Sequence, residues 1–395
     1  MNPERGRTPH SGEPLAHLAE KAVNRRAFAA NILSVLGASA ASALARRTSV
    51  GAKEGDDLSL RLDGWLTDVE GIKVGHFTDE RRPTGCTVIL CEGGATCGVD
   101  VRGGWPGTRL TDALDPVKGA SDTILIDAIV LSGGSNYGLG TASGVEQYLR
   151  EQYVRKLGAS AKDKPMVFAV PAAIIYDVEL GDWTIVPTAE SGYKACQAAA
   201  GGPIAEGNYG VGNGATVGKI FGMKQAMKGG VGTSSIKVGN TGVVVGAIAA
   251  VNALGDVIDP HTGRIIAGAR AKDGHGFANQ MSQLRHGQGI SPSEWNTTIA
   301  VVATNASFTK TEMNKIAQMA SAGLARAINP VFTTWDGDTV FALSTRASSI
   351  KMKLEVGAIG AIAAEALSEA ILRAIVNARG IPGIPSYHDI MKAAS

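Results

Sequence analysis

A hydroxyl-bearing residue stands where a polar segment of the chain changes into an apolar run. Residues 271–295 are largely polar, Thr298 to Thr304 is mostly apolar, and Thr297 lies at the junction between them. An enzyme that cuts its own chain and uses the new N-terminal residue as its nucleophile needs this layout. The loop can bend the bond that breaks, and the strand then holds the new terminus rigidly. The α-amine of such a terminus has an unperturbed pKa of about 8, so it can accept the proton of its own hydroxyl.

Other catalytic arrangements are not visible in the sequence. The histidines show no His-Glu-x-x-His pattern and no zinc-ligand spacing, and no Gly-x-Ser-x-Gly elbow occurs. We therefore expect no metal site and no serine–histidine triad, and a hydrolase built on this chain needs a base other than histidine. The plain alternative for Thr297 is that it only begins a buried strand, where β-branched residues are common.

The composition is that of a globular protein with many turns. The chain has 395 residues, of which 44% are hydrophobic and 51 are glycine, and its net charge is +2. A nearly neutral chain without a basic, aromatic-rich block is a poor candidate for binding nucleic acid, so we expect no nucleic-acid partner. Four cysteines are too few for a disulfide scaffold. Cys86, Cys91 and Cys97 contain no Cys-x-x-Cys pair, so we expect small buried thiols rather than a zinc site.

Residues 1–50 have the pattern of an export signal and linker rather than of a folded segment. The pair Arg25-Arg26 precedes an uncharged run to Ala45, which ends in an Ala-x-Ala cleavage pattern. We expect a twin-arginine-type signal and a periplasmic or secreted protein without stable membrane insertion after processing. If the signal is not used, the protein is cytoplasmic. A chance arginine pair before an Ala-rich helix and a membrane anchor are the alternatives, although the run is short for a bilayer.

Strand and helix patterns are mixed irregularly along residues 51–395. Strands are expected at 66–76, 84–90, 97–101, 122–131, 165–175, 237–251, 298–304 and 338–345, with a turn at Glu92-Gly93-Gly94 and an Asn-Thr-Gly turn within 237–251. Helices are expected at 137–153, at 189–200, after a capping box at Thr309 and Glu312, and over 359–371 with an end at Gly380. Because strands and helices do not alternate regularly, we expect an α+β fold of layered sheets covered by helices rather than a doubly wound parallel sheet.

Two glycine-rich stretches invite a nucleotide-binding interpretation. Gly138-x-Gly140-x-x-x-Gly144 follows a strand and enters a helix, but its spacing is not that of a dinucleotide loop. Gly218-Lys219 resembles the end of a phosphate loop, but Asn213 and Ile220 stand where a glycine and a hydroxyl residue are required. Close packing of small residues between helix and sheet is the simpler interpretation, and we expect no cofactor.

Five motifs, taken in order, carry a more specific signal. They are Arg102-Gly103-Gly104-Trp105-Pro106-Gly107-Thr108-Arg109, Leu131-Ser132-Gly133-Gly134-Ser135-Asn136-Tyr137-Gly138-Leu139, Asn296-Thr297-Thr298 with Ala303-Thr304-Asn305-Ala306, Gly323-Leu324-Ala325-Arg326-Ala327-Ile328-Asn329-Pro330, and Trp335-Asp336-Gly337-Asp338-Thr339-Val340-Phe341-Ala342. Through these motifs, roughly residues 65–380 resemble a family of self-cleaving N-terminal-nucleophile peptidases. That family contains the L-aminopeptidase/D-esterases, the β-aminopeptidases and the nylon-oligomer (6-aminohexanoate oligomer) hydrolases.

The resemblance implies a hydrolase of peptide or other linear amide bonds, of the aminopeptidase or amidase kind, that needs no cofactor. It implies a single-domain, four-layer α-β-β-α sandwich that cuts itself at Asn296–Thr297 into chains of residues 51–296 and 297–395. It also implies that the cleaved heterodimers assemble into a homo-oligomer and that the substrate is a small peptide or amide.

The resemblance also assigns a nucleophile and an oxyanion donor. Thr297 matches the nucleophile, and Asn252 matches the residue whose amide N–H stabilises the negative charge that develops on the attacked carbonyl. Thr298 is the neighbour that could be mistaken for the nucleophile, but the preceding Asn296 and the spacing to the segment Ala303–Ala306 favour Thr297. From the residues alone, Asn252 can also be interpreted as a turn residue.

Four further residues complete the site that the resemblance implies. Lys219 and Tyr176 match positions near the nucleophile in the nylon-hydrolase branch, where a cation lowers the pKa of the amine and a Tyr hydroxyl holds the nucleophile or the tetrahedral oxygen. Asp336 and Asp338 flank a glycine and would orient the Thr297 amine or receive a substrate's free amine. Without the resemblance, Lys219 and Tyr176 are ordinary partly exposed residues, and the two aspartates form an Asp-Gly turn or a weak calcium site.

Three functions are therefore compared. The leading one is an exported amidase or aminopeptidase whose Thr297 forms an acyl-enzyme. The alternatives are a nucleotide-binding oxidoreductase built on residues 133–144 and a non-catalytic periplasmic binding protein with the same fold. The sequence leaves open whether the substrate is an L-aminoacyl, D-aminoacyl or β-aminoacyl compound or an ω-amino oligomer.

Overall fold

The computed structural model describes residues 60, 63–118, 125–273, 276–289, 295–347 and 355–394. The described residues belong to one compact unit, Leu60–Ser395. The expected export signal and linker, residues 1–50, lie outside the described residues, so export stays a prediction. None of the helices in the described ranges is both long and apolar enough to span a bilayer.

A nine-stranded mixed sheet forms the centre of the described fold. Along it the strands follow the order β3-β5-β4-β2-β14-β12-β9-β8, and β1 pairs with β2 beside this path. β12 runs parallel to β14 and β4 runs parallel to β5, whereas the other neighbours are antiparallel. The strands are β1 Ile72–Asp79, β2 Thr84–Val101, β3 Thr108–Arg109, β4 Ile126–Ser132, β5 Ala172–Ile174, β8 Gly230–Lys237, β9 Val244–Asn252, β12 Thr297–Thr304 and β14 Thr339–Ser344.

Two smaller sheets flank the site described below. One joins β6 with β7, and the other joins β10 with β11 and β13. Their strands are β6 Thr216–Val217, β7 Met227–Lys228, β10 Asp256–Ile258, β11 Ile265–Ala267 and β13 Ile328–Asn329.

β2 is one continuous strand of 18 residues, so the turn expected at Glu92-Gly93-Gly94 is wrong. Gly93 and Gly94 have φ angles of 83° and 77°, and the register with β4 shifts between Leu90 and Ala95. Glycine tolerates positive φ, and extra residues in one strand bend it without ending it. The first half of β2 therefore pairs with β1 and β4, its second half pairs with β14, and the strand joins two half-sheets.

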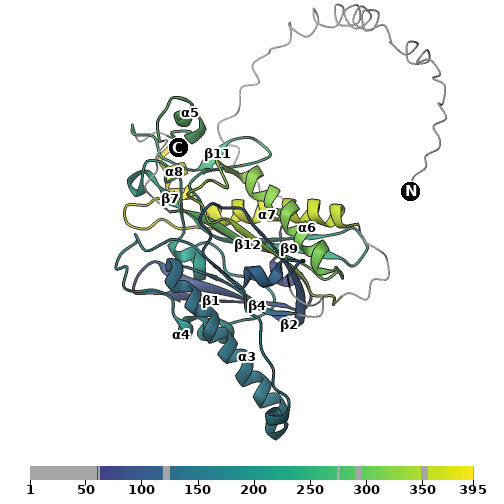
Figure 1. The fold of residues 1–395 in the computed structure, drawn as a ribbon. Coiled ribbons are helices and arrows are strands. Elements are labelled where there is room, and N and C mark those ends of the chain that lie inside the picture. Colours follow the sequence, from purple (N-terminus) through teal and green to yellow (C-terminus); the bar gives the residue numbers. More distant parts are fainter. Residues whose placement is uncertain are drawn as a thin grey trace, which may run out of the picture. The chain divides into compact units, whose positions relative to one another are not determined.

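Helices cover the outer faces of the two half-sheets, as Figure 1 shows. α3 (Thr141–Leu157) and α4 (Ala189–Gln197) belong to the half-sheet of β1 and β4. α6 (Lys310–Ala327) and α7 (Val356–Val376) pack on each other and on the half-sheet of β8, β9 and β14. The two half-sheets therefore lie between the two pairs of helices.

Two apolar clusters separate these layers. Val130 packs with α3 and α4 residues, whereas its neighbour Leu131 belongs to a cluster shared with Val301 and Phe341 of the other half-sheet. Successive strand residues point to opposite faces, so one strand contributes to both clusters. The expected α+β class is confirmed, and the four-layer sandwich stays a prediction.

The sequence patterns predicted the positions of the helices well, but the residues at which they begin and end less well. The capping box is confirmed, since Thr309 precedes α6 and its hydroxyl accepts from the Glu312 N–H at 3.3 Å. The expected helix at 137–153 begins as the 3-10 segment Ser135–Gly140 and continues as α3. α7 ends at Val376, with Asn377 as its C-cap, before the expected Gly380. The remaining helices are α5 Gln280–Arg285 and α8 Tyr387–Ala394.

The strand predictions near both ends of the sheet differ from the structure in extent. Leu66–Asp68 is a 3-10 turn and not part of the first strand. The expected strand at 165–175 is reduced to β5. The Asn-Thr-Gly turn expected within 237–251 is confirmed, because it joins β8 to β9 in an antiparallel hairpin, but β8 already begins at Gly230.

The Gly138–Gly144 pattern serves close packing, as expected, at the end of β4 and between two helices. A Cβ placed on Gly138 would lie 2.8 Å from the Oγ of Ser132, the last residue of β4. A Cβ placed on Gly144 of α3 would lie 1.7 Å from the Ala189 carbonyl oxygen at the start of α4. A Cβ on Gly192 of α4 would lie 2.1 Å from the Thr141 carbonyl oxygen. Each helix therefore uses a glycine to approach the backbone of the other, which leaves the pattern without a need for a nucleotide.

Substitution at a glycine between β8 and α7 should test the close contact of these layers. A Cβ on Gly232 would lie 2.2 Å from both the Ala370 carbonyl oxygen and the Ala374 nitrogen, so the helix must move. We expect Gly232→Ala to lower the free energy of unfolding by roughly 1–3 kcal/mol, measured by denaturant titration. Gly201→Ala is the matched control, because no atom lies within 4 Å of its added Cβ. Equal stability of the two variants would contradict the packing described here.

Candidate active site

Thr297 begins β12 in the interior of the sheet. β12 lies between β9 and β14, and Thr297 stands opposite Asn252, the last residue of β9, in the antiparallel register. The preceding residue, Asn296, forms a parallel bridge with Asp336 just before β14. Thr297 is buried, with 4% of its surface exposed. Strand pairing therefore brings the end of β9, the start of β12 and the approach to β14 to one point.

The peptide between Asn296 and Thr297 is held on both sides by backbone contacts. The Asn296 N–H donates to the Trp335 carbonyl at 3.0 Å, and the Asn296 carbonyl accepts from the Gly337 N–H at 3.0 Å. The Thr297 hydroxyl also donates to the Asn296 carbonyl. The Thr297 hydroxyl is thus in contact with a carbonyl oxygen that also accepts from a fixed backbone N–H donor.

The Asn252 side chain is oriented by three neighbours. Its Oδ1 accepts from the Thr216 N–H at 2.9 Å and from the Lys219 Nζ at 2.9 Å, and Lys219 also donates to the Asn252 carbonyl at 3.2 Å. Because Oδ1 is occupied by donors, the amide nitrogen must point the other way, where it donates to the Tyr176 carbonyl at 3.0 Å. Lys219 is 1% exposed, so it is not the ordinary partly exposed residue that the sequence alone allowed.

Asp336 and Asp338 are buried and hold the segment before β14 in place. The Asp336 carboxylate accepts from the Thr333 N–H at 3.0 Å and from its hydroxyl at 2.6 Å. The Asp338 carboxylate accepts from the Thr298 N–H at 2.6 Å and from the Phe332 N–H at 3.0 Å. Burial raises the pKa of both carboxyl groups, and the neighbouring Asp336 charge raises the pKa of Asp338 further. These contacts fasten the segment to the first residues of β12.

A small cavity of about 240 Å³ opens beside Thr297. Its lining consists of Trp105, Gly107, Ser135, Asn136, Ile174, Tyr176, Trp295, Asn296 and Thr297. The structure thus brings together all seven residues expected at the site, since Asn252, Asp336 and Asp338 contact this lining or the start of β12, and Lys219 contacts Asn252. That proximity is a structural result, whereas the roles of these residues in catalysis stay a prediction.

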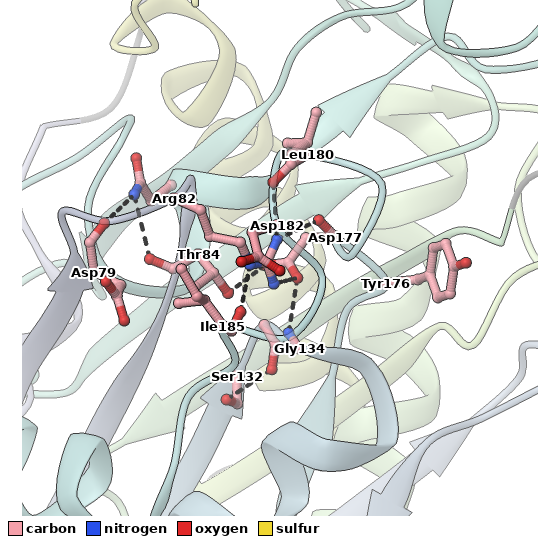
Figure 2. Close-up of polar contacts among 12 residues, drawn as sticks. Asp79, Arg82, Thr84, Ser132, Gly134, Tyr176, Asp177, Leu180, Asp182 and Ile185 are labelled. Atoms are coloured by element: carbon pink, nitrogen blue, oxygen red, sulfur yellow. Dashed lines mark hydrogen bonds and ion pairs between the residues drawn. The ribbon is translucent and has the colours of Figure 1, made fainter.

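A buried ion pair supports two walls of this cavity (Figure 2). The Arg82 guanidinium donates to the Asp177 carboxylate at 2.8 Å, and both residues are at most 4% exposed. Arg82 also donates to the carbonyls of Asp177, Leu180 and Ile185. The carboxylate in turn accepts from the Gly134 N–H at 2.8 Å and the Thr84 hydroxyl at 2.7 Å. Such extensive hydrogen bonding is what makes a buried charge pair tolerable.

The positions joined by this pair explain its importance for the cavity. Tyr176 directly precedes Asp177, and Figure 2 shows its ring pointing away from the carboxylate. Ser135 directly follows Gly134 and has a φ angle of 53°, a conformation that is strained for a residue other than glycine. The Ser135 N–H donates to the Ile175 carbonyl at 3.1 Å. The ion pair therefore fixes the backbone of both segments that carry Tyr176, Ser135 and Asn136 to the lining.

Sequence reasoning missed this ion pair and a row of indoles. Arg82 and Asp177 are far apart in the chain, and no local pattern joins them. Trp105, Trp295 and Trp335 lie in or beside the motifs that flank the site, and they account for three of the five tryptophans in the chain. Their rarity and their common position beside the motifs were the signal that could have identified them.

Other features of the described fold do not compete with this site. Among the residues placed by the structure, no group of three or more His, Cys, Asp or Glu could hold a metal ion. The cysteines Cys86, Cys91 and Cys97 are buried free thiols, as expected, and Cys196 is one as well. Burial raises the pKa of each. A larger hollow of about 780 Å³ beside α3 contains none of the residues expected at the site.

Comparison with known proteins agrees with the motifs. The sequence model of peptidase family S58 matches residues 65–388 of this chain. An uncharacterized aminopeptidase of Mycobacterium tuberculosis is 41% identical over 355 residues, which cover 83% of this chain and 98% of that protein. A 6-aminohexanoate-oligomer endohydrolase of a Kocuria species is 28% identical over 326 residues, which cover 78% of this chain and 84% of that protein.

A solved structure shares the fold. It is the L-aminopeptidase D-Ala-esterase/amidase from Ochrobactrum anthropi, described as a variant of the Ntn hydrolase fold. The TM-score is 0.58 at 20% identity, over 85% of this chain and 95% of that one, so this likeness shows the fold alone. A nucleotide-binding oxidoreductase and a non-catalytic binding protein are not favoured by any of these relatives. The chain belongs to peptidase family S58, and it is a hydrolase that acts on amide bonds.

Proposed function

We propose that the protein cuts itself between Asn296 and Thr297 and then hydrolyses small peptides or other linear amides, with Thr297 as an N-terminal nucleophile. The observation that carries the proposal is the contact of the Thr297 hydroxyl with the Asn296 carbonyl, whose oxygen accepts from the Gly337 N–H. The names of the relatives, an aminopeptidase and an oligomer endohydrolase, support amide substrates of both peptide and non-peptide kinds.

Self-cleavage would begin with attack of the Thr297 Oγ on the Asn296 carbonyl carbon. The Gly337 N–H stabilises the negative charge that develops on the carbonyl oxygen. The carbon–nitrogen bond breaks, the proton of the hydroxyl passes to the departing nitrogen, and an ester joins Asn296 to the Thr297 Oγ. Water then hydrolyses this ester, which leaves a carboxylate on Asn296 and a free α-amine on Thr297.

Hydrolysis of a substrate would use the same hydroxyl and the new amine. The amine takes the proton from the Thr297 Oγ as it attacks the substrate carbonyl and returns the proton to the leaving nitrogen. Water then releases the acyl group from the Oγ. The Asn252 amide lies opposite the nucleophile in the sheet and supplies a donor to the oxyanion, while Lys219 holds that amide in orientation and lowers the pKa of the amine through its charge. No cofactor takes part.

The cleaved form would be a heterodimer of residues 51–296 and 297–395, and these heterodimers would assemble into a homo-oligomer. Native mass spectrometry of the active protein tests both statements. A monomeric single chain that retains amidase activity would contradict them.

Replacing one hydroxyl by a methyl group tests whether Thr297 or Thr298 is the nucleophile. Thr297→Val should leave one uncut chain by intact-mass analysis and lower amidase activity by roughly 10³-fold or more, because the attacking atom is gone. Thr298→Val is the matched control at the next position. The Thr298 hydroxyl is buried without a hydrogen-bond partner in the described structure, so its loss should leave both cleavage and activity close to wild type.

The two outcomes exclude different explanations. If Thr297→Val is cut normally, the scissile bond is elsewhere. If Thr298→Val, and not Thr297→Val, abolishes both processes, the nucleophile is Thr298.

Gly337→Ala should slow self-cleavage by crowding the nucleophile. The added Cβ would lie 2.9 Å from the Thr297 Oγ and 2.8 Å from the Trp105 carbonyl oxygen. A displacement of this order at a reacting group costs up to about 10²-fold in rate. The fraction of cut chain should be followed by mass spectrometry over time after synthesis, with Gly201→Ala as the control. Unchanged cleavage kinetics would argue against the proposed position of the scissile bond.

The buried Asp338 should make stability fall as the pH rises from acid. Its folded pKa is well above the ordinary 3.8, so the folded state keeps the proton that the unfolded chain loses. The favourable contribution is complete below pH 3.8 and is lost as the pH rises through the folded pKa. We expect the free energy of unfolding of wild type to decline more steeply across this window than that of Asp338→Asn. Parallel pH profiles would contradict the direction of this pKa shift.

A further inference from the structure

The geometry points to a subsite for the acyl side of the substrate that the chain itself fills before it is cut. We propose that the Trp295 indole occupies a slot between Trp105 and Trp335, and that after self-cleavage this slot takes an uncharged aromatic group of the substrate. That group would lie one residue before the amide that breaks. This inference rests on the proposed function and specifies the substrate class for the same site.

Stacking contacts define the slot. The Trp295 ring centroid lies 5.1 Å from that of Trp105 and 5.5 Å from that of Trp335, with interplanar angles of 40° and 51°. These distances lie in the range at which aromatic pairs attract each other. The two outer indoles are joined through the backbone, because the Trp105 N–H donates to the carbonyl of Asp336, the residue after Trp335, at 2.9 Å. The walls therefore remain when the ring between them moves.

Self-cleavage gives a reason for the slot to empty. The Thr297 hydroxyl is in contact with the Asn296 carbonyl, so a substrate carbonyl that takes the place of that carbonyl meets the same hydroxyl. Asn296 must withdraw after the cut, and Trp295 is bonded directly to it. A substrate that follows the same path would place its scissile residue at the Asn296 position and its preceding residue at the Trp295 position.

The chemistry of the lining favours a neutral group over an ammonium. The residues around the cavity are aromatic, aliphatic, amide or hydroxyl residues, and none of these lining residues is a carboxylate. Asp336 and Asp338 are nearby, but each accepts two hydrogen bonds from the protein and is nearly fully buried. The lining therefore offers a substrate ammonium no carboxylate for an ion pair, whereas its indole surfaces can stack on an aromatic group. We expect cleavage of amides that are extended and blocked on the acyl side.

Three p-nitroanilides test the proposal with the cleaved wild-type protein. They are N-acetyl-tryptophanyl-asparagine p-nitroanilide, N-acetyl-alanyl-asparagine p-nitroanilide and asparagine p-nitroanilide with a free amine. We expect kcat/KM for the first to exceed that for the second by about tenfold, the value of two stacking contacts, and to exceed that for the third by at least as much. Equal rates for the two acetylated compounds, or a higher rate for the free amine, would overturn the proposal.

Indole substitutions assign the preference to the slot. Trp105→Leu and Trp335→Leu should each reduce the ratio of the two acetylated substrates toward one. Trp183→Leu is the control, because Trp183 is 59% exposed and does not line the cavity, and it should keep the wild-type ratio. A ratio that is unchanged in both slot variants would place the aromatic preference elsewhere and overturn the assignment.

Failure of this inference can be told apart from failure of the proposed function. An uncut chain that hydrolyses none of the three compounds would overturn both. A chain cut before Thr297 that hydrolyses only the free amine, or none of the compounds, would overturn the slot while leaving self-cleavage in place. The wild-type comparison decides the slot even if an indole variant remains uncut.

Discussion

The pairing of β12 with both of its neighbours is the constraint on which the site depends. Antiparallel register with β9 puts Asn252 opposite Thr297, and the parallel approach of β14 puts the Trp335 carbonyl and the Gly337 N–H on the Asn296 backbone. A strand in the interior of a sheet has both edges hydrogen-bonded, so its first residue is held more tightly than a loop residue would be. The Thr297 hydroxyl and the Asn296 carbonyl are consequently positioned mainly by the backbone.

The Arg82–Asp177 pair extends this rigidity to the opposite wall. Its charges are removed from water, which is unfavourable unless protein groups replace the lost hydrogen bonds, and here carbonyl oxygens, an N–H and a hydroxyl do so. The same contacts tie the segment of Tyr176 to the strained turn at Ser135. Thr297 and the facing lining are thus both fixed from within the fold, which suits a site that must hold a reacting group accurately.

Local patterns predicted part of this arrangement, and long-range pairing decided the rest. The run after Thr297 and the Thr309 capping box could be read from a few consecutive residues, because β-branched runs and capping pairs act locally. The bend in β2 could not be predicted in this way, because a Gly-Gly pair is locally typical of a turn. Only pairing with β4 and β14 makes β2 one continuous strand through Gly93 and Gly94. Arg82 and Asp177 lacked any signal, because only the fold brings their side chains together. The expected site residues came from ordered motifs, which carry information that spacing alone does not.

The strand order has a mechanical consequence for a protein divided at Asn296–Thr297. β12 and β14 would belong to the second product, yet in the sheet they lie between β9 and β2 of the first. Strands of the two products would alternate within one sheet, and separating the products would require removal of its central strands together with α6 and α7. Dissociation would then be as slow as global unfolding, so dilution alone would not part the two products.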